Sequence, residues 1–271
     1  MAGKKLIVIS GGASGIGLAL AKEYLARGAR VAAIDLDGHK LGELRSELGP
    51  DFFPLVGDIS RQADVIRAAE VIREQCGKPE VWINNAGISG VGAFDEISDD
   101  RFSRVFEVCF WGVVYGTRAA LSLMREPERG SIVNVASLSG LVASPFMSAY
   151  ASAKHAVVGF TRSLHVEKIQ QQSPVNIVLV CPGFARTAIM EGNTGFTFPK
   201  WLEWMIETPE QVAREIADGV TRGDSEITPT RHGRWIRRME RVWQGSAAVS
   251  SRALTARNWK ELLGLDAVRR T

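Results

Sequence analysis

The sequence predicts a single α/β domain built on a doubly wound parallel sheet of about seven strands. Three observations support this prediction: the length of the chain, its composition, and the regular alternation of short apolar runs with longer helical patterns. A length of 271 residues suits one large domain better than two small ones. Hydrophobic residues make up 45% of the chain and charged residues 23%, which is typical of a folded protein with a buried core.

Short β-rich runs are the strand candidates, and several of them are apolar at nearly every position. Continuous apolar character indicates burial on both faces, as in a parallel sheet that is covered by helices. The candidates are Leu6–Ser10, Arg30–Asp35, Asp51–Val56, Val81–Asn84, Ser131–Ala136, Val175–Cys181 and Glu226–Thr228.

Helical patterns separate these runs. Alternating strands and helices form parallel βαβ units, and ligands of such sheets bind beyond the carboxyl ends of the strands. The predicted helices span residues 16–27, 38–48, 61–76, 99–126, 149–172 and 209–222.

Residues 188–208 interrupt the alternation with a long connection that is rich in large apolar side chains. A connection of this length in a compact domain is usually functional. We interpret it as a lid whose apolar lining favours a bulky hydrophobic substrate, the alternative being that its aromatic groups only pack on the domain. These side chains are Ile189, Met190, Phe196, Phe198, Trp201, Trp204 and Met205.

The basic character of the chain resides in its tail, which we separate from a domain of residues 1–229. Residues 230–271 hold 10 Lys and Arg against 3 Asp and Glu, whereas residues 1–229 hold 23 against 27. On a helix, Trp235, Met239 and Val242 would share one face among arginines. This pattern favours docking on the domain itself or on a neighbouring subunit, and contact with an anionic membrane surface is the alternative. Nucleic-acid binding is not expected, because the domain is acidic and has no recognition motif.

The cysteines and the N-terminal residues indicate the cellular compartment in which we expect the protein. Cys76, Cys109 and Cys181 are far apart and match no metal-ligand spacing, so neither a disulfide framework nor a metal site is expected. The first apolar run stops at Ser10, too early for a secretory signal. No apolar stretch approaches the roughly 20 residues of a spanning helix. We therefore expect a cytoplasmic protein, with His39 and His232 at its surface.

A glycine-rich turn follows the first predicted strand and predicts a dinucleotide site. Gly11, Gly15 and Gly17 allow a tight turn and a close approach to a pyrophosphate at the start of a helix. Asp35 ends the second strand, 20 residues after Gly15, where a carboxylate can accept hydrogen bonds from the adenosine ribose. Such a carboxylate would repel a 2′-phosphate, so the pattern favours NAD over NADP. The alternative is that Asp35 only caps the loop before the helix at residue 38.

Tyr150 and Lys154 stand four residues apart in a helical pattern and so share one face. Ser137 lies thirteen residues before Tyr150. Together with the other motifs, this set resembles the short-chain dehydrogenase/reductase family over residues 5–228. The matching motifs are the turn of Gly11, Gly15 and Gly17, the pair Asp58-Ile59, the run Asn84-Asn85-Ala86-Gly87, the group Ser137, Tyr150 and Lys154, and the run Pro182-Gly183 with Thr187.

The resemblance implies a Rossmann-type fold, a homodimer or homotetramer built on the helices near 99–126 and 149–172, and an NAD-dependent exchange between a secondary alcohol and a ketone. It implies that Tyr150 is the general acid and base, that Lys154 lowers the pKa of Tyr150 and binds the nicotinamide ribose, and that Ser137 holds the substrate oxygen. The residues implied in cofactor binding are Gly11, Ser14, Gly15, Ile16, Gly17, Asp35, Asp58, Ile59, Asn85, Ala86, Gly87, Tyr150, Lys154, Pro182, Gly183, Ala185 and Thr187.

The chain departs from the family pattern at Cys109, where members usually have an asparagine that helps to place a proton-relaying water. A thiol is a weak hydrogen-bonding group, which places turnover in question more than cofactor binding. The alternative function is therefore an NAD-binding, redox-responsive module with little catalysis. A redox-sensing cysteine needs exposure and a lowered pKa, and a buried small hydrophobic residue is the interpretation we prefer. A third alternative is a membrane-surface adaptor that uses residues 230–271.

Overall fold

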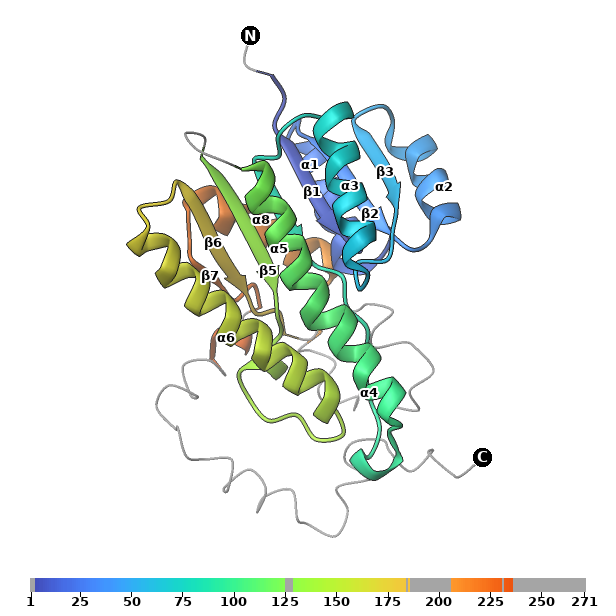
Figure 1. Ribbon diagram of the computed structural model, residues 1–271, viewed down its shortest axis with the longest axis vertical. Coiled ribbons are helices and arrows are strands. Elements are labelled where there is room, and N and C mark those ends of the chain that lie inside the picture. The colour runs from blue at the N-terminus through green and yellow to red at the C-terminus, as the bar shows by residue number, and fades with distance from the viewer. Residues whose placement is uncertain (1–2, 125–128, 184, 186–205, 231, 236–271) are drawn as a thin grey trace.

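The computed structural model describes residues 3–124, 129–183, 185, 206–230 and 232–235 (Figure 1). Seven strands form one sheet in the order β3-β2-β1-β4-β5-β6-β7, and every neighbouring pair is parallel. The strands are β1 (Leu6–Ser10), β2 (Arg30–Asp35), β3 (Phe52–Val56), β4 (Val81–Asn84), β5 (Gly130–Val135), β6 (Val175–Val180) and β7 (Glu226–Ile227).

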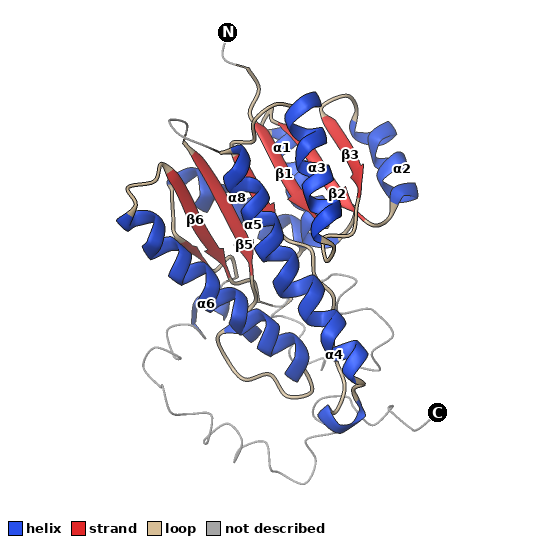
Figure 2. Cartoon of the chain, in the orientation of Figure 1, coloured by secondary structure: helices blue, strands red, loops and turns tan. Residues whose placement is uncertain are grey.

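Helices cover both faces of this sheet (Figure 2). The helices are α1 (Gly15–Ala26), α2 (Gly38–Leu48), α3 (Gln62–Gln75), α4 (Asp99–Phe106), α5 (Gly112–Leu123), α6 (Ser148–Gln170) and α8 (Pro209–Arg222). The short turns are η1 (Phe94–Glu96), the π-helical η2 (Glu107–Trp111) and η3 (Leu138–Gly140).

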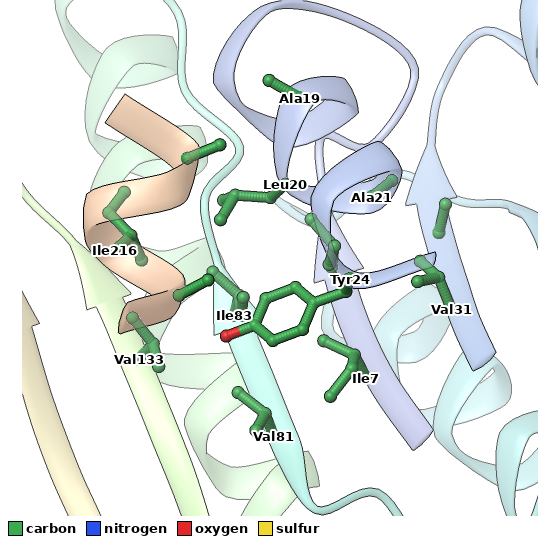
Figure 3. Packing of buried hydrophobic residues seen from close by; sticks show 14 of the residues in the cluster. Ile7, Ala19, Leu20, Ala21, Tyr24, Val31, Val81, Ile83, Val133 and Ile216 are labelled. Carbon is green, nitrogen blue, oxygen red and sulfur yellow. The ribbon is translucent and has the colours of Figure 1, made fainter. Parts of the chain in front are cut away.

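Successive side chains of the strands point to opposite faces of the sheet and pack into two separate apolar cores. Ile7 and Ile9 of β1 pack into a core with residues of α1, α2 and α8. Leu6 and Val8 point to the opposite face, where they pack with residues of α3 and α5. Burial on both faces explains why the strands are apolar throughout. Figure 3 shows the first core, with Tyr24 of α1 among apolar side chains of the sheet and of α8.

The predicted fold class is confirmed, and each strand lies within one residue of its predicted bounds. The helical pattern at 99–126 differs, because the structure divides it into α4, η2 and α5. A π-helical turn inserts an extra residue into the hydrogen-bond ladder and often occurs at functional sites. Cys109 lies at its centre. A side-chain period of 3.6 residues does not reveal such an insertion.

The expectation that His232 lies at the surface was wrong. His232 is buried, because Thr230 and His232 lie beside Gly183, and Gly233 packs against Thr228 and Leu138. Asn84 and Asn134 form a side-chain network across the sheet: the Asn84 amide donates to Asn134 Oδ1 at 2.8 Å, and the Asn134 amide donates to Thr161 Oγ1 at 3.1 Å. Each buried amide therefore finds a polar partner other than the backbone.

Three further findings concern membrane-spanning helices, cysteines and metal sites. Every helix among the described residues is too short or too polar to span a bilayer. Cys76, Cys109 and Cys181 are all buried free thiols. Within the same residues, no three His, Cys, Asp or Glu side chains gather closely enough to hold a metal ion.

Candidate active site

A pocket of about 560 Å³ opens at the carboxyl ends of the strands. Its lining follows the last residues of β1 to β6, as expected for a doubly wound sheet. The predicted site residues that line it are Gly11, Ser14, Gly15, Ile16, Asp35, Asp58, Ile59, Asn85, Ala86, Gly87, Ser137, Tyr150, Lys154, Pro182, Gly183 and Ala185. Gly17 does not line the pocket, and Thr187 lies outside the described residues.

The turn between β1 and α1 is packed too closely for side chains at its glycines. Gly11 has a φ of +69°, and a Cβ atom on it would lie 2.8 Å from the Cα atom of Ala86. A Cβ atom on Gly17 would overlap the carbonyl oxygen of Gly11. Gly17 therefore serves the packing of α1 against the turn, and its neighbours Gly15 and Ile16 face the pocket.

The first residues of α1 present unpaired backbone N–H groups to the pocket. Ser14 is the N-cap, and its side chain makes no capping hydrogen bond. The first N–H groups of a helix have no partner within the helix, and the helix dipole adds positive potential there. Such a helix end can hold a phosphate group.

Asn85 fixes the turn from the neighbouring strand. Its side-chain amide donates to the carbonyl oxygens of Ser10 at 3.1 Å and Gly11 at 3.3 Å. The Ser10 hydroxyl in turn accepts from the backbone N–H groups of Asn85 at 3.0 Å and Ala86 at 3.2 Å. These four bonds hold the end of β1 and the end of β4 together across one wall of the pocket.

Asp35 lies at the far end of the pocket. Its Oδ2 accepts from the Ala13 N–H at 2.9 Å, and its Oδ1 accepts from the Asp37 N–H at 3.2 Å. Asp37, not Asp35, caps α2 by accepting from the Lys40 N–H at 2.9 Å. Asp35 thus ties the loop after β2 to the glycine-rich turn and still faces the pocket.

Arg104 of α4 also lines the pocket, although no motif in the sequence points to it. Its guanidinium donates to Asp58 Oδ2 at 3.0 Å and to Glu107 Oε2 at 3.2 Å. Hydrogen bonds from Ser60 and Arg104 outweigh the effect of desolvation and lower the pKa of Asp58. Asp58 is therefore an oriented carboxylate near neutral pH. A spacing of 46 residues between the two partners leaves no local pattern that could predict this pair.

Ser137, Tyr150 and Lys154 meet at the centre of the pocket. The Ser137 hydroxyl lies close enough to the Tyr150 hydroxyl to act on its pKa. Lys154 Nζ lies 5.6 Å from the centroid of the Tyr150 ring and donates to the Val135 carbonyl oxygen at 2.8 Å. Tyr150 and Lys154 lie one turn apart on α6, and Ser137 follows β5, so a helix and a strand position the three groups.

Burial governs the protonation of this centre. Desolvation raises the pKa of Tyr150, a nearby Cys109 thiol acts in the same direction, and the Ser137 hydroxyl opposes them. Desolvation also lowers the pKa of Lys154. Burial therefore disfavours the charged form of both groups, and the effect of Lys154 on the pKa of Tyr150 stays a prediction.

Cys109 is fully buried beside this centre. Its Sγ accepts from the Ile88 N–H at 3.4 Å and donates to the Ile88 carbonyl oxygen at 3.3 Å. The thiol therefore satisfies both backbone groups of a residue that lines the pocket. This explains why a residue with both a donor and an acceptor is suited to the position.

The pocket wall on the other side of Tyr150 is apolar. It combines the loop after η3 with the residues that follow Gly87, and no motif in the sequence points to either stretch. Its apolar residues are Ile88, Val91, Val142, Ala143, Pro145, Phe146 and Met147. Among the described lining residues, the charged ones are Asp35, Asp58, Arg104 and Lys154, and none of these belongs to this wall.

The predicted lid at 188–208 lies outside the described residues except for its last three. Glu207 forms an isolated parallel bridge with Ala185, a residue of the pocket lining. Thr208 caps α8. Most of the predicted tail, at 231 and 236–271, also lies outside the described residues, whereas Thr230 is fully buried and Arg234 pairs with Glu215 at 2.6 Å.

Comparison with known proteins agrees with this architecture. Residues 5–195 match the model of the short chain dehydrogenase family. The chain is 36% identical over 218 residues to an uncharacterized oxidoreductase, YxnA of Bacillus subtilis, covering 78% of this chain and 61% of that protein. It is 34% identical to the putative oxidoreductase SadH of Mycobacterium tuberculosis, over 82% of this chain and 85% of that protein.

A solved structure of a short chain dehydrogenase/reductase from Burkholderia phymatum, in complex with NAD, superimposes with a TM-score of 0.81. The two are 26% identical, and the match covers 91% of this chain and 95% of that one. The chain belongs to the short chain dehydrogenase family.

Proposed function

We propose that this protein is an NAD-dependent oxidoreductase that interconverts a neutral, apolar secondary alcohol and its ketone, with Tyr150 as the group that transfers the proton. The observation that carries the proposal is the meeting of Ser137, Tyr150 and Lys154 in one pocket with the glycine-rich turn and Asp35. Substrate oxygen chemistry and dinucleotide binding would then take place in the same cavity. The NAD complex of the Burkholderia relative supports the choice of cofactor.

The residues of the pocket fit a dinucleotide. The packed glycine turn leaves the backbone free of side chains, and the start of α1 offers N–H groups for a pyrophosphate. Asp35 would accept from the adenosine ribose and would repel a 2′-phosphate, which favours NAD over NADP. Asp58, held by Arg104, would face the adenine, and Gly183 and Ala185 would lie beside the nicotinamide together with Thr187. The bound cofactor supplies or accepts the hydride.

Tyr150, Ser137 and Lys154 would then move the proton. The raised pKa keeps the Tyr150 phenol protonated at neutral pH, so it can donate its proton to the oxygen of a ketone. Ser137 would hold that oxygen through its hydroxyl group. In the direction of alcohol oxidation the phenol must first lose its proton, and a charged Lys154 ammonium would stabilise the phenolate.

The apolar wall supports a substrate without charge next to its reacting carbon. Burying an unpaired charge against Val142, Phe146 and Met147 would cost several kcal/mol. A bulky hydrophobic molecule, such as a steroid, a terpenoid or a lipid, would bury its body there. We also propose that residues 188–208 form a lid over this wall.

The rival hypothesis of a redox-responsive binding module depended on Cys109. Its thiol is fully buried and hydrogen-bonded to Ile88, whereas a redox sensor needs an exposed thiolate. NAD binding alone also requires neither Ser137 nor Tyr150. Both points favour an enzyme over a redox-responsive binding module.

Assembly is proposed on α4, α5 and α6. Trp111 of η2 and Val166 and Ile169 of α6 are large apolar residues that are 43%, 53% and 62% exposed. A homodimer or homotetramer would cover such side chains. Residues 230–271 would add to an interface or pack on the domain.

Replacing Tyr150 by Phe tests the mechanism. We expect turnover of a secondary alcohol with NAD to fall by about 100-fold or more, while NADH binding, followed by nicotinamide fluorescence, is kept. Tyr115→Phe, at a partly buried tyrosine of α5 that does not line the pocket, is the matched control and should keep its turnover. Unchanged turnover in Tyr150→Phe would contradict the proposed mechanism.

The cofactor preference is tested by titration with NADH and NADPH. We expect tighter binding of NADH, and Asp35→Ala should narrow the difference between the two. Tighter binding of NADPH to the unaltered protein would overturn the role proposed for Asp35.

A further inference from the structure

The loop that leads into α6 contains a turn with an unexpected residue. In Ser144-Pro145-Phe146-Met147, the Met147 N–H donates to the Ser144 carbonyl oxygen at 3.2 Å, which closes a four-residue turn. Proline occupies the second position, and Phe146 in the third has a φ of +60°. These are the features of a type II turn, whose third position favours glycine because a side chain is strained there.

Only one other described residue besides glycine has a positive φ, and its setting is ordinary. Gln172, with a φ of 53°, directly follows the C-cap of α6, where a left-handed residue commonly ends a helix. It is exposed to solvent. Phe146 ends no helix and carries a bulky ring, for which a left-handed backbone is a genuine outlier. Its conformation therefore needs another explanation.

The surroundings of Phe146 hold the turn in place against the pocket. Its carbonyl oxygen accepts from the Gly92 N–H at 2.9 Å, which joins the turn to the segment after β4. The residue lines the pocket together with Val142, Met147 and Val91. It precedes Tyr150 by four residues. Strained residues of this kind persist where the surrounding structure enforces them, and they gather at ligand sites.

We propose that Phe146 is the specificity-determining residue of this site, and that its left-handed backbone is the cost of placing an aromatic ring against the apolar body of the substrate. This inference rests on the proposed function, because it assumes a substrate whose reacting carbon lies at Tyr150. The class of substrate it selects is a secondary alcohol or ketone with a broad apolar surface, such as a fused-ring compound. Small aliphatic alcohols would cover little of the ring.

The strain is tested by thermal unfolding and needs no substrate. At position 146 we expect Phe146→Gly to melt a few degrees above Phe146→Ala, because both remove the ring and only glycine relieves the backbone. Gln172→Gly and Gln172→Ala should show the same order. Ser152, an exposed residue within α6, provides the opposite control. Ser152→Gly should melt below Ser152→Ala, because glycine is the poorer helix former. An alanine variant at 146 that is as stable as the glycine variant would overturn the claim of strain.

The specificity is tested with a pair of alcohols, the fused-ring compound 2-decalol and the small 2-propanol, each oxidised with NAD. We expect the ratio of kcat/KM for 2-decalol over that for 2-propanol to fall about tenfold in Phe146→Gly and less in Phe146→Leu, because the ring supplies apolar contact area to one substrate only. An unchanged ratio in Phe146→Gly would overturn the assignment.

A binding measurement separates this inference from the proposed reaction. Stabilisation of the protein by 2-decalone in the presence of NADH is followed by thermal shift in the unaltered protein and in Phe146→Gly. If the unaltered protein oxidises neither alcohol, the proposed reaction fails. A decalone shift that is present in the unaltered protein and lost in Phe146→Gly would still support the role of Phe146, and equal shifts or none in both proteins would overturn it.

Discussion

Tyr24 and Tyr150 are both buried phenols on helices that cover the sheet, yet their surroundings differ. Tyr24 of α1 lies in the apolar core shared with α8 (Figure 3), and its hydroxyl has no hydrogen-bond partner among the described residues. Tyr150 of α6 lines the pocket, has the Ser137 hydroxyl close enough to act on its pKa and has Lys154 Nζ 5.6 Å from its ring. One side chain serves packing, and the other lies among polar groups that can exchange a proton.

The comparison teaches that a raised pKa does not by itself mark a functional tyrosine. Desolvation raises the pKa of Tyr24 to about 12 and is also the largest cause of the upward shift at Tyr150. What distinguishes Tyr150 is access to a cavity and a hydroxyl and an ammonium nearby. Perturbed groups gather at active sites, but structural burial perturbs them equally well. The predictions below test this distinction.

The largest expected effect comes from Lys154. Replacing it by Met removes the buried ammonium beside Tyr150, so we expect steady-state turnover with NAD to fall by about 100-fold or more. Lys168→Met, near the exposed end of the same helix, is the matched control and should keep its turnover. Equal losses in the two variants would show that the position of the ammonium is unimportant.

The pH dependence of the two reaction directions is the next largest effect. Because the pKa of Tyr150 is raised, its phenol is protonated at neutral pH, and alcohol oxidation needs the phenolate. We expect kcat for oxidation to rise with pH, by up to about tenfold per unit, while ketone reduction does not rise. Rate profiles from pH 6 to 9 measure both. Oxidation that is independent of pH over this range would contradict the assignment of Tyr150.

Cys109 should contribute to stability more than to redox chemistry. Cys109→Ala leaves the buried N–H and carbonyl groups of Ile88 without their partner, so we expect a loss of about 1–3 kcal/mol in the free energy of unfolding. Cys109→Ser, which keeps a donor and an acceptor, should lose less. Urea denaturation measures both variants. An alanine variant as stable as the serine variant would show that the two bonds contribute nothing.

The smallest effect is expected at Tyr24. Tyr24→Phe removes a buried hydroxyl without a partner, so we expect the free energy of unfolding to rise by about 1 kcal/mol with turnover unchanged. Since the folded pKa is about 12, an unfolded chain ionises first as the pH rises above about 10, and the unaltered protein loses stability there. The Tyr24→Phe variant should lack the part of this stability loss that comes from ionisation of Tyr24. A destabilised variant would mean that the hydroxyl is satisfied in solution.

Local patterns were sufficient for the fold and for 16 of the 33 residues that line the pocket. An apolar run such as that of Leu6–Ser10 reports burial on both faces, and its bounds follow from a few consecutive residues. The glycine turn and the spacing of Ser137, Tyr150 and Lys154 are local as well, so their positions at the carboxyl ends of the strands could be expected. Arg104, by contrast, meets Asp58 only through the packing of α4 on the loop after β3.

The sequence by itself determined the order of strands and helices, the glycine turn and the groups available for proton transfer, because these depend on side-chain periodicity and short spacings. Only the tertiary structure decided the π-helical turn at Cys109, the burial of His232, the direction of the pKa shift at Tyr150 and the left-handed turn at Phe146. Each of these depends on desolvation or on contacts between residues far apart in the chain. Such contacts have no periodicity that a sequence can display, and they arise only when the sheet brings its strand ends together.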